Sequence, residues 1–215
     1  MEFLVKRIAN CPIDSNSFVI YHHGETSCVI VDPGTPDCAE LLVYLQKNKL
    51  VPEYIILTHG HFDHIWGVNK LKDTFNCKIA CTKDCAEKIV DKKRNLSIFY
   101  NQVGFEAYSA DIIVNSESTI RWHNVTFQFI ETPGHTDGCL CIFANNKIFT
   151  GDTMLNKLKT VVKLPGGSKK KLRNSLELIF KKFVGKTIEV YPGHGDMFIL
   201  EENSFEYCYA KKNNV

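Results

Sequence analysis

The stretch Thr58-His59-Gly60-His61-Phe62-Asp63-His64 places three imidazoles and a carboxylate within six residues. It follows an apolar run, Tyr54-Ile55-Ile56-Leu57, which predicts a buried strand that ends where the histidines begin. Burying these polar groups side by side costs free energy unless a cation binds them. Neutral imidazole and ionised carboxylate are ligands of zinc and iron, so the stretch predicts a divalent metal site at a strand end. A polar surface turn that is merely rich in histidine is the alternative.

Three more candidate ligands each follow an apolar run and stand beside a glycine. They are His135 in Pro133-Gly134-His135-Thr136, Asp152 in Gly151-Asp152-Thr153, and His194 in Pro192-Gly193-His194-Gly195. Glycine allows the backbone to turn sharply and to approach other groups closely. A metal site needs more ligands than one turn can aim, so we expect these side chains to complete it.

In this order, the motifs His-x-His-x-Asp-His, Pro-Gly-His-Thr, Gly-Asp and Pro-Gly-His-Gly resemble those of the metallo-β-lactamase superfamily. Within that superfamily the chain is most similar to the glyoxalase II branch, and the resemblance runs from about Phe18 to about Gly195. It implies an α/β fold in which two mixed sheets and outer helices form a four-layer αββα sandwich. A chain of 215 residues suits one such domain, and we expect residues 1–215 to form it.

The resemblance also implies how the candidate ligands divide between metals. One metal would be held by His59, His61 and His135, a second by Asp63, His64 and His194, and Asp152 would bridge the two. These ligands are too many for one four-coordinate zinc, so two Zn²⁺ per chain are expected, with iron or a mixture of metals as the alternative.

The activity that the resemblance implies is hydrolysis of a thioester or related ester by a metal-bridging hydroxide. Asp63 would be the catalytic residue, because it would both bind a metal and orient this nucleophile. Asp32, in Asp32-Pro33-Gly34, would hold a ligand histidine from behind, or would act only as a turn and cap residue.

A function from another class is a mononuclear iron oxidoreductase that resembles persulfide dioxygenases. These share the His-x-His-x-Asp-His turn but use one iron held by two histidines and an aspartate, and ligand types do not separate iron from zinc. Many relatives carry Gly-Arg-x-Asp before a turn like Leu164–Ser168, whereas this chain has Thr160-Val161-Val162-Lys163. The loss of that pattern weakens the iron alternative.

Substrate contacts are less well defined, and Lys163, Phe99 and Tyr100 are the candidates. Lys163 belongs to a run between Asp152 and Glu177 that holds basic but no acidic residues. This run is a solvated face, or it steers an anionic substrate. Phe99 and Tyr100 lie in the aperiodic segment 92–118, which is a binding loop or an insertion that buries its own aromatic side chains.

Relatives of the glyoxalase II branch carry a C-terminal helical region that grips glutathione. After His194 this chain has room for about one helix, around Glu201–Ala210. Recognition of glutathione therefore does not follow from the resemblance.

Composition limits the possible partners. The formal net charge is only +2, and the longest apolar runs are short. These features favour a small-molecule substrate over nucleic acid or a membrane surface. Because Met1–Arg7 does not have the pattern of a signal peptide, we expect a cytoplasmic protein. Nothing in the sequence indicates an oligomeric state.

Nine cysteines are many for a chain of this length. The spacing of Cys77, Cys81 and Cys85 resembles that of metal ligands, but a predicted strand and the start of a helix separate them, so we expect their thiols to point in different directions. Buried, reduced thiols are the expectation for a protein without a secretory signal. We expect His22 and His23, at a predicted hairpin turn, to be solvated and not to bind a metal.

Overall fold

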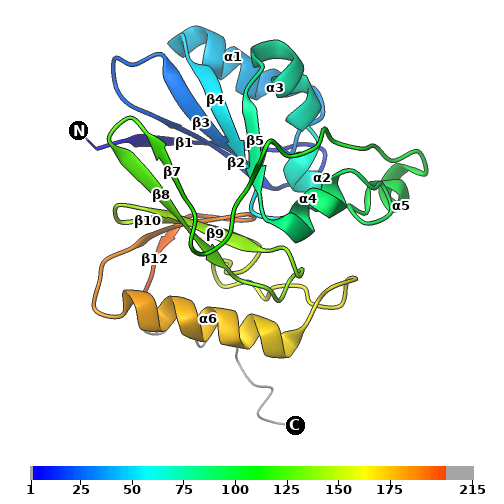
Figure 1. Ribbon diagram of the computed structural model, residues 1–215, viewed down its shortest axis with the longest axis vertical. Helices are drawn as coiled ribbons and strands as arrows, with labels where there is room; N and C mark the ends of the chain where they lie inside the picture. The colour runs from blue at the N-terminus through cyan, green and yellow to red at the C-terminus, as the bar shows by residue number, and fades with distance from the viewer. Residues whose placement is uncertain (1, 202–215) are drawn as a thin grey trace.

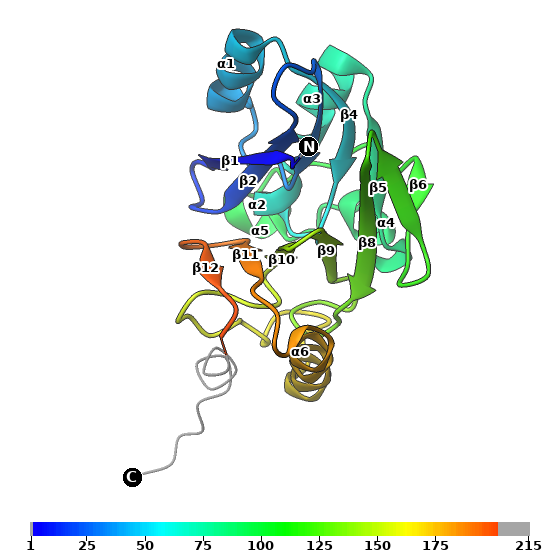
Figure 2. The ribbon, with the colours of Figure 1, turned by 90° about the vertical axis from the view of Figure 1, so that its left-hand side faces the viewer.

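Two six-stranded sheets pack face to face and carry helices on their outer faces (Figure 1). The structure, a computed structural model, describes residues 2–201. Figure 2 shows the same layers from the side, with α1 and α3 above the sheets and α6 below them. The predicted αββα sandwich is therefore confirmed.

In the first sheet the order of the strands in space follows their order in the chain. The strands are β1 (Leu4–Ala9), β2 (Asn16–Tyr21), β3 (Ser27–Val31), β4 (Val51–Ile56), β5 (Lys78–Cys81) and β6 (Ile112–Ile113). The pairs from β1 to β3 are antiparallel, and those from β3 to β6 are parallel. Parallel neighbours need crossover helices, and the chain supplies them after β3, β4 and β5.

The second sheet has the order β12-β11-β10-β9-β8-β7. Its strands are β7 (Thr119–Trp122), β8 (Val125–Glu131), β9 (Leu140–Ala144), β10 (Lys147–Gly151), β11 (Glu189–Pro192) and β12 (Phe198–Ile199). Only β10 and β11 pair in parallel, and α6 (Lys169–Phe183) connects them.

The helices of the first half are α1 (Ala39–Asn48), α2 (Phe62–Ile65), α3 (Val68–Phe75), α4 (Lys83–Ile89) and α5 (Ser97–Asn101). Of these, α1 and α3 cover the outer face of the first sheet (Figure 1). The single turn α2 contains the second half of the histidine stretch, and α4 follows β5 beside it. Segment 92–118, predicted to be aperiodic, contains only α5 and the two-residue β6.

Apolar side chains fill the space between the sheets and beneath the helices. Phe18, Ile56, Phe127 and Phe149 are buried between the two sheets. Leu172, Leu176, Ile179 and Phe183 recur at helical spacing along α6 and bury one stripe of it against the second sheet. The Ser168 side chain accepts a hydrogen bond from the Lys171 N–H and so caps the start of α6.

This topology brings several strand ends to one edge of the sandwich. Because β3 and β4 run parallel, Asp32 and Thr58 follow their carboxyl ends side by side. Because β10 and β11 run parallel, Asp152 and His194 follow theirs in the same way. Polar side chains that are far apart in the sequence therefore meet where the two sheets face each other.

One expectation about a side chain outside this edge is wrong. His22 is buried, at 5% exposure, and its ring stacks on Trp122 with 5.0 Å between ring centroids. The hairpin turn packs against β7 of the other sheet, which local sequence cannot reveal; His23 is exposed as expected. Within residues 2–201, Cys77, Cys81 and Cys85 do not form a group of converging ligand atoms, as expected, although a side-chain interaction with Cys81, followed by burial, raises the pKa of Cys85.

The cysteines of residues 2–201 are all free, and all but Cys11 are buried, as expected. Among the same residues no helix has the length and apolar character needed to cross a membrane. The helix predicted around Glu201–Ala210 lies outside the described residues.

Candidate metal centre

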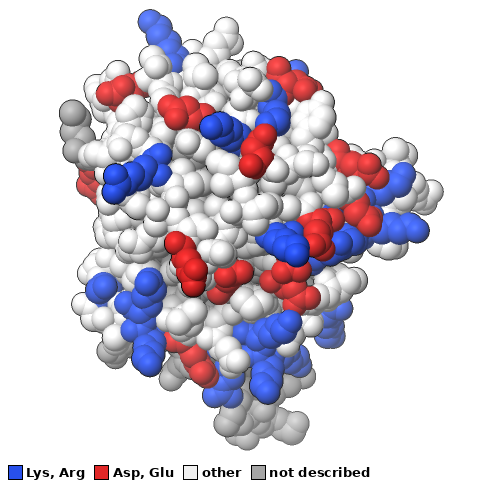
Figure 3. Space-filling view, viewed as in Figure 1, with Lys and Arg blue, Asp and Glu red and all other residues white. Residues whose placement is uncertain are grey.

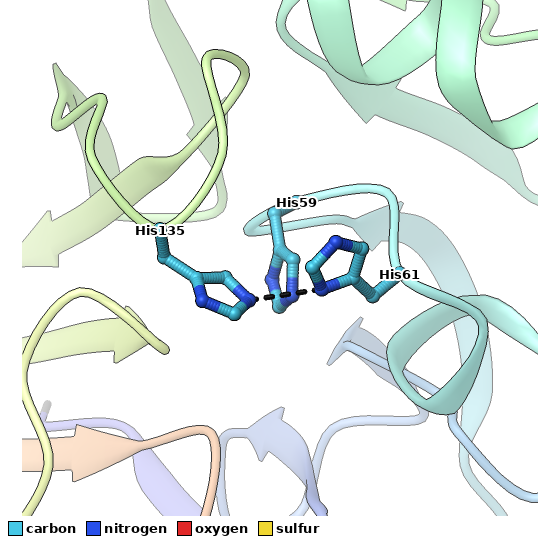
Figure 4. A group of neighbouring side chains, drawn as sticks. All are labelled: His59, His61 and His135. Atoms are coloured by element: carbon cyan, nitrogen blue, oxygen red, sulfur yellow. Dashed lines mark hydrogen bonds between the residues drawn. The ribbon is translucent and has the colours of Figure 1, made fainter. Parts of the chain in front are cut away.

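The histidine stretch leaves β4 and turns directly into α2. His61 occupies the position before the first helical residue, so Asp63 and His64 lie on the first turn of α2. His135 comes from the loop between β8 and β9, and Figure 4 shows its ring pointing toward those of His59 and His61. All three rings are buried. The imidazoles that the sequence separates by more than seventy positions therefore share one site.

His59, His61 and His135 form the first group of converging ligand atoms. One atom of each residue lies within 4.8 Å of the others. His135 Nε2 is 2.9 Å from His61 Nδ1, the contact drawn as a dashed line in Figure 4. The ring of His59 stands nearly perpendicular to the other two, at 78° and 83°. This arrangement leaves three nitrogens facing a common centre.

Asp63, His64 and His194 form a second group with the same compactness. His64 Nε2 is 3.3 Å from His194 Nε2. One Asp63 carboxylate oxygen lies 3.5 Å from the former nitrogen and 3.4 Å from the latter. The two groups of side chains match the division that the family resemblance implies.

Asp152 lies between the two groups. Its Oδ2 is 3.4 Å from His135 Nε2 in the first group and 3.6 Å from His194 Nε2 in the second, while its Oδ1 is 3.5 Å from His64 Nε2. Gly193 makes room for this carboxylate, because a Cβ there would lie 2.4 Å from Asp152 Oδ1. Oxygens of Asp152 therefore face both groups of candidate ligands.

The opposite nitrogens of the rings have their own acceptors. His64 Nδ1 is 3.1 Å from Asp32 Oδ2, and Asp32 Oδ1 also accepts the Thr58 N–H at 2.8 Å. His135 Nδ1 is 2.6 Å from the Val161 carbonyl, and His194 Nδ1 is 2.6 Å from the Asp14 carbonyl. Such contacts fix the orientation of each ring. Asp32 thus holds a candidate ligand, the first of the two roles expected for it.

Burial and mutual repulsion set the charges of the first group. Burial, followed by the positive charge of the neighbouring imidazoles, holds the pKa of His59 well below its ordinary value. The pKa of His61 is lowered in the same way, by burial and then by His135. These rings are therefore neutral at pH 7, which is the state that binds a metal.

In the second group, the charges of carboxylates outweigh the effect of burial. Burial alone would lower the pKa of His64, but the charges of Asp63, Asp152 and Asp32 outweigh burial and raise this pKa to about 10. Burial opposes ionisation of Asp63, yet His64 and His194 lower its pKa. The carboxylates therefore demand positive charge at this position, and a divalent cation would supply it.

Two unsatisfied atoms test whether a metal fits. Within residues 2–201, His59 Nε2 and Asp152 Oδ1 are buried without a hydrogen-bond partner. Buried polar atoms are rarely left without a partner, because the loss of hydration is costly. One of the two atoms belongs to the first group and the other to the residue between the groups. The donor set therefore fits metal ions on both sides of Asp152.

Sequence comparison agrees with this geometry. The profile of the Metallo-beta-lactamase superfamily matches residues 12–194 of this chain, which include every candidate ligand. This chain belongs to the metallo-β-lactamase superfamily. Members of the superfamily bind divalent metals and are mostly metal-dependent hydrolases, and the chain has a histidine-rich candidate site for such metals.

Curated relatives differ in what they are named for. An uncharacterised protein of Mycobacterium tuberculosis is 31% identical over 193 residues, covering 84% of this chain and 86% of its own. A probable polyketide biosynthesis zinc-dependent hydrolase of Bacillus subtilis is 29% identical, covering 78% of this chain and 67% of its own. A hydroxyacylglutathione hydrolase of Vibrio vulnificus is 29% identical and covers 67% of this chain, but the match spans only 49% of its own length.

Solved structures support the same fold. The structure of the BLEG-1 B3 metallo-beta-lactamase superposes with a TM-score of 0.84 at 28% identity, covering 91% of this chain and 94% of the other. ETHE1 from Myxococcus xanthus gives a TM-score of 0.75 at 20% identity, covering 93% and 81%. At that level of identity the second likeness concerns the fold alone.

The candidate substrate contacts do not all lie beside the candidate ligands. Tyr100 packs on Phe62, the residue between His61 and Asp63, with ring centroids 5.1 Å apart. Phe99 is 74% exposed, so segment 92–118 does not bury all of its aromatic side chains. Lys163 is exposed and belongs to neither group of candidate ligands.

Sequence reasoning missed the acceptors of His135 and His194, which are backbone carbonyls and carry no sequence signal. It also missed Lys88, a buried lysine whose Cβ packs against Gly60. Only the absence of a side chain at Gly60 hints at such a neighbour, since a Cβ there would lie 2.9 Å from Lys88 Cβ.

Proposed function

We propose that this chain is a hydrolase with two metal ions that cleaves a thioester or a related ester of a small molecule. The observation that carries the proposal is the position of Asp152 between two complete groups of ligand-type side chains, with oxygens facing both. A site for one metal would need no second group. Zinc is the proposed metal, because histidine and carboxylate ligands suit it and the Bacillus subtilis relative is named as zinc-dependent.

The proposed ligands of one ion are His59, His61 and His135; those of the other are Asp63, His64 and His194; Asp152 is shared. Divalent metals bound there would supply a water nucleophile at neutral pH and an electrophile for the substrate carbonyl. The contacts to Asp32, Thr58 and the two backbone carbonyls keep the rings in place while substrate exchanges.

Asp63 is the proposed catalytic residue. Its Oδ2 faces the two histidines of its group, and we assign its other oxygen to orient the attacking water. Asp63 reaches this position because His61 ends the loop and α2 begins at Phe62. An aspartate at this point of the turn therefore joins metal binding to control of the nucleophile.

Two features support the kind of substrate proposed. Phe62, Trp66 and Tyr100 form an aromatic wall next to the candidate ligands, and Tyr100 is 44% exposed, which suits an apolar part of the substrate. Lysine and arginine side chains gather over the lower part of the molecule, where α6 lies (Figure 3). These charges, with Lys163, favour an anionic substrate.

The free thiols support a reducing compartment, so we also propose a cytoplasmic location. All cysteines of residues 2–201 are free, although the side chains of Cys81 and Cys85 interact. Free thiols are typical of proteins inside cells.

One assay separates this function from its rival. Purified protein is given a glutathione thioester, a neutral acyl thioester and glutathione persulfide, while thiol release and oxygen uptake are followed together. The proposal expects thiol release without oxygen uptake, and little advantage for the glutathione thioester. Oxygen uptake with the persulfide, and no thioester cleavage, would replace the proposal by an iron oxidoreductase.

A further inference from the structure

Two lysines are buried in the described part of the chain, and only one of them has acceptors. Lys147, at 6% exposure, donates to Glu2 at 2.7 Å and to Glu189 at 3.0 Å. Lys88, at 7% exposure, has a buried Nζ without a hydrogen-bond partner anywhere in residues 2–201. Burying an ammonium without a hydrogen-bond partner costs free energy, so a partner for Lys88 Nζ is expected.

Lys88 lies on α4, which packs against the histidine stretch at Gly60. Its Cβ would lie 2.9 Å from a Cβ at Gly60, the residue between His59 and His61. Its positive charge is one of the influences that lower the pKa of His61. Lys88 therefore lies beside the first group of candidate ligands, although it cannot bind a metal while protonated.

The far end of the side chain reaches a turn of glycines. A Cβ built on Gly166 would lie 3.3 Å from Lys88 Nζ and also 3.3 Å from Asp137 Oδ2. Burial lowers the pKa of Lys88 although the charge of Asp137 acts against it; the other oxygen of Asp137 pairs with Lys171 at 2.7 Å, and no ion pair between Asp137 and Lys88 occurs within residues 2–201. The ammonium thus lies beside Gly166, and no ion pair or hydrogen bond joins it to a carboxylate within residues 2–201.

The missing acceptor indicates what this ammonium binds. Lys88 Nζ is buried without a hydrogen-bond partner in residues 2–201, and an anionic group beside it would supply both an acceptor and a compensating charge. We propose that Lys88 binds a carboxylate, or a similar anionic group, of the substrate held at the metal centre. This inference rests on the proposed function and adds to it an anionic group on the substrate near the scissile carbonyl.

Access to Nζ requires a small movement of the turn Leu164–Gly167, since the atom is covered in the structure. Gly166 lies against Nζ and has no side chain to obstruct an incoming group. The anion would belong either to the acyl part or to the thiol part of the substrate. The two sources share the same chemistry, so substrates must distinguish them.

Matched substrates isolate the anionic group. S-succinyl-N-acetylcysteamine and its terminal amide differ only in a carboxylate on the acyl part. S-acetyl-3-mercaptopropionate and its amide differ only in a carboxylate on the thiol part. We expect the parent protein to prefer the carboxylate in one of these pairs by roughly 10- to 100-fold in kcat/KM, the range for a hydrogen bond to a charged group.

Three variants test whether Lys88 causes the preference. Lys88→Met keeps the length of the side chain and removes its charge, and it should abolish the preference without lowering the metal content. Lys88→Arg should retain most of the preference. Lys83→Met removes the same charge from an exposed position of the same helix and should change nothing. A parent without preference in either pair, or Lys88→Met with the preference intact, would overturn the proposal.

A binding measurement keeps this test independent of turnover. Isothermal titration calorimetry of the metal-loaded protein measures the affinities for two pairs of ligands. One pair is succinate and its monoamide, succinamate; the other is 3-mercaptopropionate, with its thiol free, and the amide of that acid. If the parent cleaves no thioester but binds the charged member of one pair more tightly through Lys88, the hydrolase assignment fails and the anion site stands. If the parent protein binds the carboxylate and the amide equally tightly in both pairs, the proposed anion site is disproved, whether or not the protein is a hydrolase. Should Lys88→Met not fold, the parent and Lys88→Arg still decide by these comparisons.

Discussion

Asp32 Oδ2 lies 3.1 Å from His64 Nδ1, and both side chains are buried. The same carboxylate accepts hydrogen bonds from the backbone and the hydroxyl of Thr58. Asp32 is thus anchored by the residue that begins the histidine stretch, and it fixes the ring that belongs to the second group of candidate ligands. The end of β3 thereby controls the geometry at the end of β4.

Replacing Asp32 by Asn should lower the affinity for the proposed second metal without abolishing its binding. Partners of this kind typically contribute about 10- to 100-fold to metal affinity. Asp14→Asn is the matched control, because only the backbone carbonyl of Asp14 contacts His194. Competition against a chelator of known affinity measures the change. Equal affinities in the parent and Asp32→Asn would show that Asp32 is only a turn residue.

Asp63→Asn should retain the fold, since Asp63 is a partly exposed residue at the start of a helix and not part of the apolar core. Loss of its negative charge should empty the second metal position and reduce kcat by at least about 100-fold, as expected for a group that directs a nucleophile. Circular dichroism, metal content and thioester hydrolysis report the three effects. Hydrolysis near the parental rate would mean that Asp63 does not orient the nucleophile.

Metal binding should stabilise the fold. The candidate ligands come from distant parts of the sequence and converge only in the folded chain, so we expect the folded chain to bind metal better than the unfolded chain does. Free zinc at a hundred times its dissociation constant should add about 2.7 kcal/mol to the free energy of unfolding. Urea unfolding with and without chelator measures this term. His59→Ala should lose most of it, whereas His123→Ala, at an exposed position, should keep it.

The groups of candidate ligands could be predicted because each lies in a short motif at a strand end. Apolar runs such as Tyr54–Leu57 indicated where strands end, and the family resemblance assigned the candidate ligands to two groups. Other contacts could not be predicted, since Val161 and Asp14 contribute carbonyls, which every residue has. Lys88 was missed for a different reason: a lysine on a helix is usually solvated, and only the packing of α4 over Gly60 buries it.

The same limit applies to His22. A polar turn with His-His-Gly favours exposure, and only the packing of the β2–β3 hairpin on Trp122 of the second sheet buries the ring. Local pattern therefore predicted the strand that leads into the histidine stretch, while contacts between the sheets had to come from the structure.

Gly151→Ala tests how closely the two strand ends approach. Gly151 has a φ of +48°, and a Cβ there would lie 2.3 Å from Thr58 Oγ1. Backbone strain and overpacking together should reduce the free energy of unfolding by about 2–4 kcal/mol. Gly24→Ala is the control, with a φ of +84° and nothing within 4 Å of the added carbon. Equal losses in the two variants would show that strain alone matters and that the contact with Thr58 does not.

The metal content of the purified protein tests the central claim most directly. Elemental analysis gives the number and identity of the ions, and anomalous diffraction gives their positions. We expect two ions per chain, zinc in the simplest case, on either side of Asp152 and about 3.5–4 Å apart. A single tightly held iron, with no ion beside His194 when metal is in excess, would contradict the dinuclear hydrolase and favour the iron oxidoreductase.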